Sequence, residues 1–401
     1  MKLPFDVRGP AFDAGALRKT IRRALAAAGL DTGSGPLRGV ADTVRRALAA
    51  GGLAERSGAP EAGEPVVDAK ARVGGTGTDR TGAPLPGPAT GDALRPGRFE
   101  THEFSNPAGA RSYKLFLPAR TAAAPPPVLV MLHGCTQSAD DFAAGTRMNR
   151  LAGEQGFLVV YPEQPPSANP SKCWNWFNAQ DQQRDAGEPS LIAGIVREVV
   201  ARHGADPRRV FVAGLSAGAA MAVILGETYP ELFAGVGAHS GLPYGSAHDL
   251  LSALAAMKGG RSGLPGLQGI QGQQADAAPA RRKAVRAVPI IVFHGDRDHL
   301  VQATNGARIA QQAWEAHRAE AADAPLRAST HSGSSPGGRS YSRTVHADAG
   351  GEARIEFWTV HGAGHAWSGG SASGSFTDAA GPDASAEMLR FFLGLRRAGS
   401  T

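Results

Sequence analysis

One stretch, residues 210–221, constrains the fold more than any other part of the chain. It reads VFVAGLSAGAAM, an apolar β-type run that ends in Gly-Leu-Ser-Ala-Gly and passes directly into an Ala-rich helical pattern. A strand, a tight turn and a helix in this order place Ser216 at the apex, with its hydroxyl above a sheet and beside the N–H groups of the helix start. Gly214 and Gly218 leave room for the turn. The pattern predicts Ser216 as a nucleophile; an ordinary helix N-cap serine is the alternative.

The segments around this turn predict an α/β fold in which a mostly parallel sheet carries helices on both faces. The apolar run at residues 128–133 is typical of a strand buried on both sides. Such strands alternate with helical patterns, which favours parallel pairing. Further strands are expected at 157–161, 235–239, 289–294 and 354–360, helices at 140–154, 188–203 and 384–395, and hairpins at 99–117 and 340–360. The Gly-rich and Ser-rich stretches 259–287 and 321–339 are predicted to be surface insertions.

Composition divides the chain into three parts: a basic helical leader at 1–56, a flexible Gly- and Pro-rich linker at 57–97 and the α/β domain at 98–401. Within the leader, TIRRALAAAGL at 20–30 recurs as TVRRALAAGGL at 43–53. Each copy places arginines opposite apolar side chains, which predicts two short amphipathic helices. They either pack weakly or stay disordered, or they adsorb to an anionic surface such as a lipid membrane or a lipid-coated polymer granule.

Charge and hydropathy restrict the partners. The formal net charge is +6, but residues 1–56 alone hold ten Lys and Arg against five Asp and Glu, so the rest is nearly neutral. We therefore expect no nucleic-acid partner. No apolar run is long enough to span a membrane, and the N-terminus lacks the pattern of a secretory signal, which predicts a cytoplasmic or granule-associated protein. The two cysteines, Cys135 and Cys173, allow one disulfide or two thiols but no four-thiolate zinc site, and no metal or cofactor is expected.

A nucleophilic serine needs a base and an orienting acid, and in an α/β-hydrolase sheet these follow in the order Ser, Asp, His. The strand at 289–294 leads into Asp296 and Asp298, and the strand at 354–360 leads into His361 and His365. We predict Asp298 as the acid, with Asp296 as its rival. We predict His365 as the base, because Gly362 and Gly364 would let its loop reach over the sheet, whereas His361 lies directly at the strand end.

The oxyanion of an ester reaction needs two N–H donors. One is expected from Ala217, the residue after the nucleophile, and the other from the loop after the first buried strand, where Cys135 N–H is our prediction. His133 and His294 are expected to close strand ends. Trp367, next to His365, is predicted to contact substrate, while Trp174 and Trp176 either line the same cleft or pack beneath the loop.

Five motifs in order resemble the polyhydroxybutyrate (PHB) depolymerase family of esterases, α/β-hydrolases related to feruloyl and acetylxylan esterases. They are HGCTQ at 133–137, CWNWF at 173–177, GLSAGAAM at 214–221, HSGLPYG at 239–245 and HGAGHAWSGG at 361–370. The resemblance covers about residues 98–395. It implies Ser216, Asp298 and His365 as the catalytic triad and a disulfide between Cys135 and Cys173.

The resemblance also implies a substrate: an ester bond in poly(3-hydroxybutyrate) or its oligomers, cleaved through an acyl-serine. A feruloyl or acetylxylan ester is the alternative. Secreted members carry a signal peptide and usually a polymer-binding domain, which this sequence does not show, so an extracellular location is expected from the resemblance only. A third hypothesis is a protein that binds a granule or membrane surface and has a secondary hydrolase domain.

Overall fold

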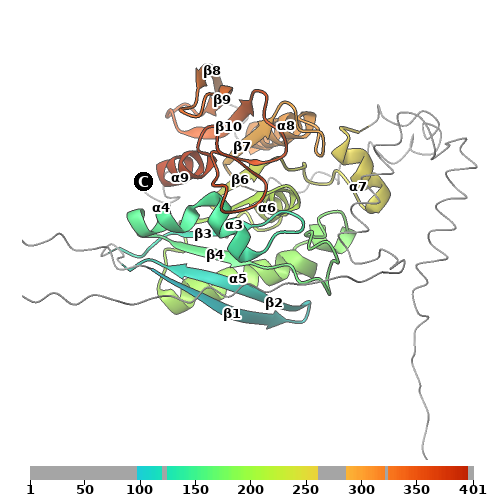
Figure 1. The fold of residues 1–401 in the computed structure, drawn as a ribbon, viewed down its shortest axis with the longest axis vertical. Coiled ribbons are helices and arrows are strands. Elements are labelled where there is room, and N and C mark those ends of the chain that lie inside the picture. The colour runs from blue at the N-terminus through green and yellow to red at the C-terminus, as the bar shows by residue number, and fades with distance from the viewer. Residues whose placement is uncertain (1–96, 120–123, 261–285, 321–323, 396–401) are drawn as a thin grey trace, which may run out of the picture. The chain divides into compact units, whose positions relative to one another are not determined.

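The computed structural model describes residues 97–119, 124–260, 286–320 and 324–395. The predicted leader at 1–56 and residues 57–96 of the predicted linker lie outside the described residues, as does most of the expected insertion at 259–287. The domain beginning near residue 98 is drawn as a ribbon in Figure 1.

A ten-stranded sheet forms the centre of the described chain, with the order β1-β2-β4-β3-β5-β6-β7-β10-β9-β8. Its middle is parallel from β4 to β10, and antiparallel hairpins extend it at both edges. The strands are β1 (Arg98–Asn106), β2 (Gly109–Leu117), β3 (Val128–Leu132), β4 (Leu158–Pro162), β5 (Val210–Leu215), β6 (Gly235–His239), β7 (Ile290–Gly295), β8 (Arg327–Ser334), β9 (Ser340–Ala347) and β10 (Ala353–Val360). A two-stranded sheet joins β11 (Trp367–Ser368) to β12 (Thr377–Asp378).

Helices cover both faces of the sheet (Figure 1). They are α3 (Ala139–Thr146), α4 (Met148–Gln155), α5 (Gly187–His203), α6 (Ala217–Thr228), α7 (Leu250–Met257), α8 (Thr304–Glu320) and α9 (Ala384–Gly394), and a 3₁₀ turn, η1, spans Ala179–Gln182. Along β3, Val128, Val130 and Leu132 pack in one core with α5 and α6, whereas Leu129 and Met131 pack in a second core with α3, α4 and α9. Alternating side chains of one fully apolar strand therefore supply two cores. This arrangement confirms the predicted α/β class.

The predicted helix at 140–154 is wrong in one respect, because it is two helices. Arg147 ends α3 in the left-handed region, with φ +54°, and α4 begins at the next residue. The Arg147 guanidinium donates to the carbonyl of Gly369 at 2.6 Å. A contact between segments so far apart in sequence leaves no local pattern to indicate the break.

The interpretation of 321–339 as a surface insertion is also corrected. Residues Arg327–Ser334 form β8, which pairs with β9 at the edge of the sheet. Nearly every residue of β8 is exposed, so the strand needs no apolar side chains. Its Ser-, Thr- and Gly-rich sequence gave no alternation to recognise.

Candidate active site

Ser216 lies in a strained turn between β5 and α6. Its backbone has φ +58° and ψ −119°, a conformation that a non-glycine residue rarely adopts. The Ser216 N–H donates to the carbonyl of His239 at 2.9 Å, so the turn is tied to the end of β6. The side chain sits at the start of α6, as the predicted strand-turn-helix pattern requires.

Gly218 shows why this turn tolerates no side chain behind the serine. A Cβ there would lie 2.1 Å from the carbonyl oxygen of Leu132 and 2.6 Å from that of His133. The first turn of α6 therefore packs against the backbone at the end of β3. This contact brings the loop that follows β3 beside Ser216.

Asp298 is a buried carboxylate in the loop after β7, with 3% of its surface exposed. Its Oδ1 accepts hydrogen bonds from the N–H groups of Leu300 (3.0 Å) and Val301 (2.9 Å). Its Oδ2 lies 2.7 Å from His365 Nδ1 and 3.4 Å from His294 Nε2. Burial alone would raise the pKa of Asp298, but the hydrogen bonds from His294 and His365 outweigh it and hold the pKa well below its usual value. The group is an anion at neutral pH.

His365 reaches Asp298 from the loop after β10. That loop runs directly over the end of β7, because a Cβ on Gly295 would lie only 2.3 Å from the carbonyl oxygen of Ala363. The anionic Asp298 accepts the proton of His365 Nδ1, which leaves Nε2 as the nitrogen that can take a proton. This is the pairing of base and orienting acid that a serine nucleophile requires.

The two rival residues form a pair of their own. His361 Nδ1 lies 3.0 Å from Asp296 Oδ2, and Gly362 N–H donates to Asp296 Oδ1 at 2.7 Å. The side chains of His361 and Asp296 are 40% and 38% exposed. His361 Nε2 contacts Ser342 Oγ at 2.9 Å on β9, a regular strand without the strained turn found at Ser216. Of the two Asp–His pairs, only Asp298–His365 is buried.

The loop after β3 holds the predicted oxyanion donor. The carbonyl of Gly134 accepts from His133 Nδ1 at 2.8 Å and from Gln137 N–H at 3.3 Å. The Cys135 N–H belongs to the same planar trans peptide, so it points away from these two donors. Ala217 N–H lies in the first turn of α6, where helix N–H groups have no intrahelical acceptor.

A disulfide joins Cys135 to Cys173, with the Cα atoms 4.2 Å apart. It fastens the loop after β3 to the loop that carries Trp174 and Trp176. Thr136 N–H also donates to the carbonyl of Ser171 at 2.7 Å. The segment around Cys135 is therefore held at several points.

All three tryptophans are buried in the cores, which agrees with the packing alternative for Trp174 and Trp176 and argues against a substrate contact for Trp367. Trp174, Trp176 and Trp367 are only 0%, 6% and 1% exposed. The Trp367 ring packs edge-on against Phe142, and its Nε1 donates to Ser385 Oγ at 3.0 Å. An aromatic side chain in such a motif can either contact substrate or pack in the core beneath the loop, and the sequence does not distinguish these two roles.

His239 is a residue of the site that the sequence did not single out. Its imidazole is buried between the rings of Trp367 (5.2 Å between centroids) and Phe293 (5.7 Å). Its Nε2 accepts from the N–H of Ser368 at 3.0 Å, and its carbonyl accepts from Ser216 N–H. The only available signal was its place at the start of HSGLPYG, directly after an apolar strand.

In the part of the chain that the structure describes, no group of three or more His, Cys, Asp or Glu side chains is arranged to hold a metal ion. Among the same residues, none of the helices combines the length and apolar character that crossing a membrane requires.

Comparisons with known proteins identify a family of esterases. A family model described as esterase PHB depolymerase matches residues 111–331. Poly(3-hydroxyalkanoate) depolymerase C of Paucimonas lemoignei is 32% identical over 261 residues, 65% of this chain and 59% of that protein. Feruloyl esterase B of Neurospora crassa is 36% identical over 141 residues, 35% of this chain and 47% of that protein. The chain thus spans about half the length of these two relatives.

Among solved structures, an acetyl xylan esterase from Aspergillus awamori matches 74% of this chain and 99% of its own, with a TM-score of 0.55 and 20% sequence identity. At this identity the likeness concerns the fold.

Proposed function

This chain belongs to the PHB depolymerase family of esterases, and we propose that it is a serine esterase that cleaves ester bonds of poly(3-hydroxybutyrate) or its oligomers. The observation that carries this proposal is the 2.7 Å contact between Asp298 Oδ2 and His365 Nδ1. These residues follow β7 and β10, at the same carboxyl end of the parallel strands as the strained turn of Ser216 after β5.

The positions of these groups support the following mechanism. His365 Nε2 takes the proton of Ser216 Oγ as that oxygen attacks the ester carbonyl carbon, and Asp298 stabilises the imidazolium. The negative oxygen accepts hydrogen bonds from Ala217 N–H and Cys135 N–H. His365 then gives its proton to the leaving alcohol oxygen. Water, deprotonated by His365, cleaves the acyl-serine and restores the enzyme.

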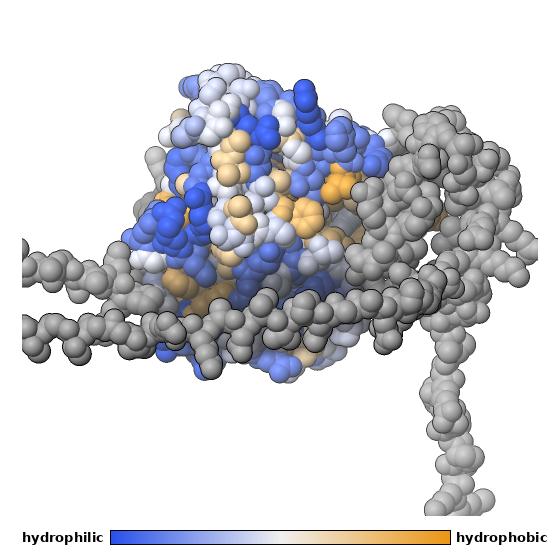
Figure 2. Space-filling view, in the orientation of Figure 1, coloured by the Kyte–Doolittle hydropathy of each residue, from blue (hydrophilic) through white to orange (hydrophobic). Residues whose placement is uncertain are grey.

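Exposed apolar side chains beside Asp298 support an aliphatic substrate. Leu300, two residues after the acid, is exposed, and α7 presents Leu250, Leu251 and Leu254 to solvent. The end of α7 lies against this loop, because Gln302 N–H donates to the carbonyl of Met257 at 2.8 Å. A hydroxybutyrate chain would bury apolar surface on these leucines, whereas a polysaccharide would gain little from them. The part of the surface visible in Figure 2 is mostly hydrophilic, with small separate apolar patches.

The alternative is a carbohydrate esterase. It is favoured by the matches to feruloyl esterase B and to acetylxylan esterase A of Emericella nidulans, which is 35% identical over 141 residues. These matches are slightly more similar than the depolymerase match but much shorter.

We further propose the organisation expected from composition: a leader at 1–56, a linker at 57–97 and a catalytic domain from 98. The paired arginines of the leader would hold the enzyme at an anionic lipid or granule surface. This role favours a cytoplasmic or granule-associated enzyme, and the family's secreted members provide the extracellular alternative. In the third hypothesis the surface contact is the main role and hydrolysis is secondary.

The test is hydrolysis of amorphous poly(3-hydroxybutyrate), hydroxybutyrate oligomers and methyl ferulate by the wild type and by Ser216→Ala. We expect the wild type to cleave polymer or oligomers and the variant to lose at least about 10³-fold in rate. Cleavage of ferulate alone would place the protein with the carbohydrate esterases. Equal rates for the two proteins would exclude Ser216 as the nucleophile.

A further inference from the structure

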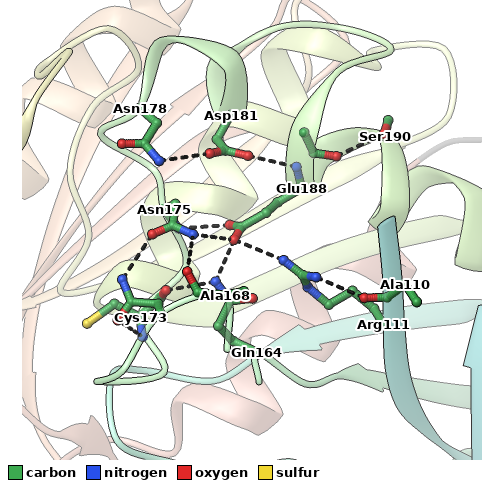
Figure 3. A network of polar contacts seen from close by, with 12 residues as sticks. Ala110, Arg111, Gln164, Ala168, Cys173, Asn175, Asn178, Asp181, Glu188 and Ser190 are labelled. Carbon is green, nitrogen blue, oxygen red and sulfur yellow. Dashed lines mark hydrogen bonds and ion pairs between the residues drawn. The ribbon is translucent and has the colours of Figure 1, made fainter. Parts of the chain in front are cut away.

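Glu188 is a buried carboxylate for which the mechanism has no use. It lies in the first turn of α5 and is only 3% exposed. Figure 3 shows four donors converging on it. Its Oε1 accepts from Gln164 Nε2 (2.5 Å), Asn175 Nδ2 (2.8 Å) and Arg111 Nη2 (3.3 Å), and its Oε2 accepts from Asn175 N–H (2.8 Å). Because burying a carboxylate is costly unless such partners are present, the surrounding residues form a site built for an anion.

Two of these partners belong to the loops that hold the oxyanion segment. Gln164, fully buried after β4, donates its backbone N–H to His133 Nε2 at 3.1 Å and its Nε2 to the carbonyl of Cys173 at 2.9 Å. His133 in turn donates from Nδ1 to the carbonyl of Gly134. Asn175 lies two residues after Cys173, whose sulfur is bonded to Cys135. Two routes therefore run from Glu188 to the Gly134–Cys135 peptide.

The backbone of Glu188 is also held in place. Glu188 N–H donates to Asp181 Oδ1 at 2.8 Å, and Asn178 Nδ2 donates to Asp181 Oδ2 at 3.1 Å (Figure 3). Gly187 makes this approach possible, because a Cβ there would lie 2.2 Å from Asp181 Oδ1 and the residue has φ +50°. Burial, and then the charge of Asp181, raise the pKa of Glu188, while the hydrogen bonds from Gln164 and Asn175 and the charge of Arg111 oppose the rise.

We propose that Glu188 is a positioning residue of the oxyanion hole. By fixing Gln164 and Asn175, it holds His133 and the Cys135–Cys173 bridge, and through them it keeps the Cys135 N–H aimed at the ester oxygen. The inference rests on the proposed function for the role of Cys135. The arrangement of the loop that it explains can be measured without an ester.

The variant is Glu188→Gln, which keeps the shape but turns an NH₂ group toward donors. The matched control is Glu198→Gln on the same helix, since Glu198 accepts from Tyr113 Oη (3.0 Å) on β2 and has no contact with the oxyanion loops in the described chain. Removing one oxyanion donor costs about 10²–10³-fold in kcat, so a misaimed donor should cost about tenfold. We expect that loss for Glu188→Gln with KM changed less than about twofold, and near-wild-type kcat for Glu198→Gln.

Two further readouts separate positioning from general destabilisation. A phenylboronic acid forms a tetrahedral adduct on the nucleophilic serine with an oxygen in the oxyanion hole. Its inhibition constant should therefore rise by about the same factor as kcat/KM falls. Hydrogen exchange of the peptide covering 133–137 should speed up in Glu188→Gln but not in Glu198→Gln. Asn175→Ala, which removes only the Nδ2 donor and keeps the backbone N–H, should shift all three readouts in the same direction if Glu188→Gln does not fold.

Unchanged exchange at 133–137 would overturn the inference, whatever the enzyme hydrolyses. So would equal losses of kcat in Glu188→Gln and Glu198→Gln, because that result indicates a structural role only. A wild type without Ser216-dependent esterase activity would refute the proposed function instead, and the exchange measurement would still decide the position of the loop.

Discussion

At the scale of single residues, the two Asp–His pairs pose the sharpest question. Both acids follow β7 and both histidines follow β10, so their order in the sequence does not separate them. Burial does. The carboxylate of Asp298 is shielded from water, where its charge acts strongly on the imidazole of His365, whereas the pair of Asp296 and His361 is substantially exposed and screened.

The first prediction compares Asp298→Asn with Asp296→Asn. Asparagine at 298 would leave His365 without its anionic partner and favour the wrong tautomer. We therefore expect kcat for a soluble p-nitrophenyl ester to fall about 10³- to 10⁴-fold. Asp296→Asn should retain kcat within a few-fold, because its partner His361 is not the proposed base. A larger loss at 296 than at 298 would reverse the assignment of the acid and, with it, of the base.

His239 connects two parts of the site by separate atoms. Its carbonyl holds the nucleophile turn through Ser216 N–H, and its Nε2 holds the segment after His365 through Ser368 N–H. Burial, and then the neighbouring imidazoles of His294 and His365, lower the pKa of His239 to about 3. The ring is therefore neutral, and its Nδ1 carries the proton.

The second prediction concerns this acceptor. His239→Phe keeps an aromatic ring between Trp367 and Phe293 but leaves Ser368 N–H unsatisfied, which should cost about 1–3 kcal/mol in the free energy of unfolding. His239→Gln offers an acceptor oxygen and should recover part of that loss. Urea unfolding at pH 7 measures both. If His239→Phe were as stable as the wild type, the hydrogen bond would contribute nothing.

The same substitution also predicts a dependence on pH. Below about pH 6.5 the unfolded chain protonates His239, whereas the folded ring stays neutral until about pH 3. The unfolded state therefore binds more protons in this window, and the free energy of unfolding decreases as the pH is lowered. His239→Phe lacks this titration. The stability difference between the wild type and His239→Phe should therefore shrink from pH 7 to pH 5. A constant difference would mean that the folded ring keeps an ordinary pKa.

At the scale of secondary structure, the sequence best predicted the features that depend on residues close together in the chain. The parallel strands were recognisable because both of their faces are buried and apolar. Ser216, Asp298 and His365 could be proposed as a triad because each follows such a strand. The break at Arg147, the polar edge strand β8 and the burial of Trp367 depend on contacts between distant segments. His239 was not singled out because its functional atoms include a backbone carbonyl, which every residue has.

The third prediction concerns the junction of β5 and α6. Gly218→Ala would drive a Cβ against two backbone carbonyls of the β3 end, and backbone cannot move aside as a flexible side chain can. We expect a loss of about 2–3 kcal/mol in the free energy of unfolding, together with lost esterase activity as Ser216 shifts. Gly394→Ala, at the end of α9 with nothing within 4 Å of its added Cβ, is the control. It should be neutral or slightly stabilising. Equal effects at the two glycines would mean that α6 does not pack this closely.

At the scale of the whole molecule, the described residues, which begin just before β1, contain two complete cores and the candidate site. Both cores run continuously along the sheet, from Tyr113 to Ile355 on one side and from Phe116 to Phe392 on the other. The expected leader and linker precede all of these residues in the chain. Catalysis and surface attachment are therefore expected to be separable.

The last prediction tests this separation with a chain shortened to begin at Gly97. We expect its kcat for a soluble p-nitrophenyl ester to stay within about twofold of the full chain, because the proposed triad and both proposed oxyanion donors lie after residue 97. Its binding to vesicles containing an anionic phospholipid should fall sharply, because ten Lys and Arg are removed with the leader. Raising the salt concentration should weaken the binding of the full chain in the same way, since exposed charges are screened. A shortened chain that still binds the vesicles would place the contact on the catalytic domain, where the exposed leucines of α7 would become the first residues to substitute.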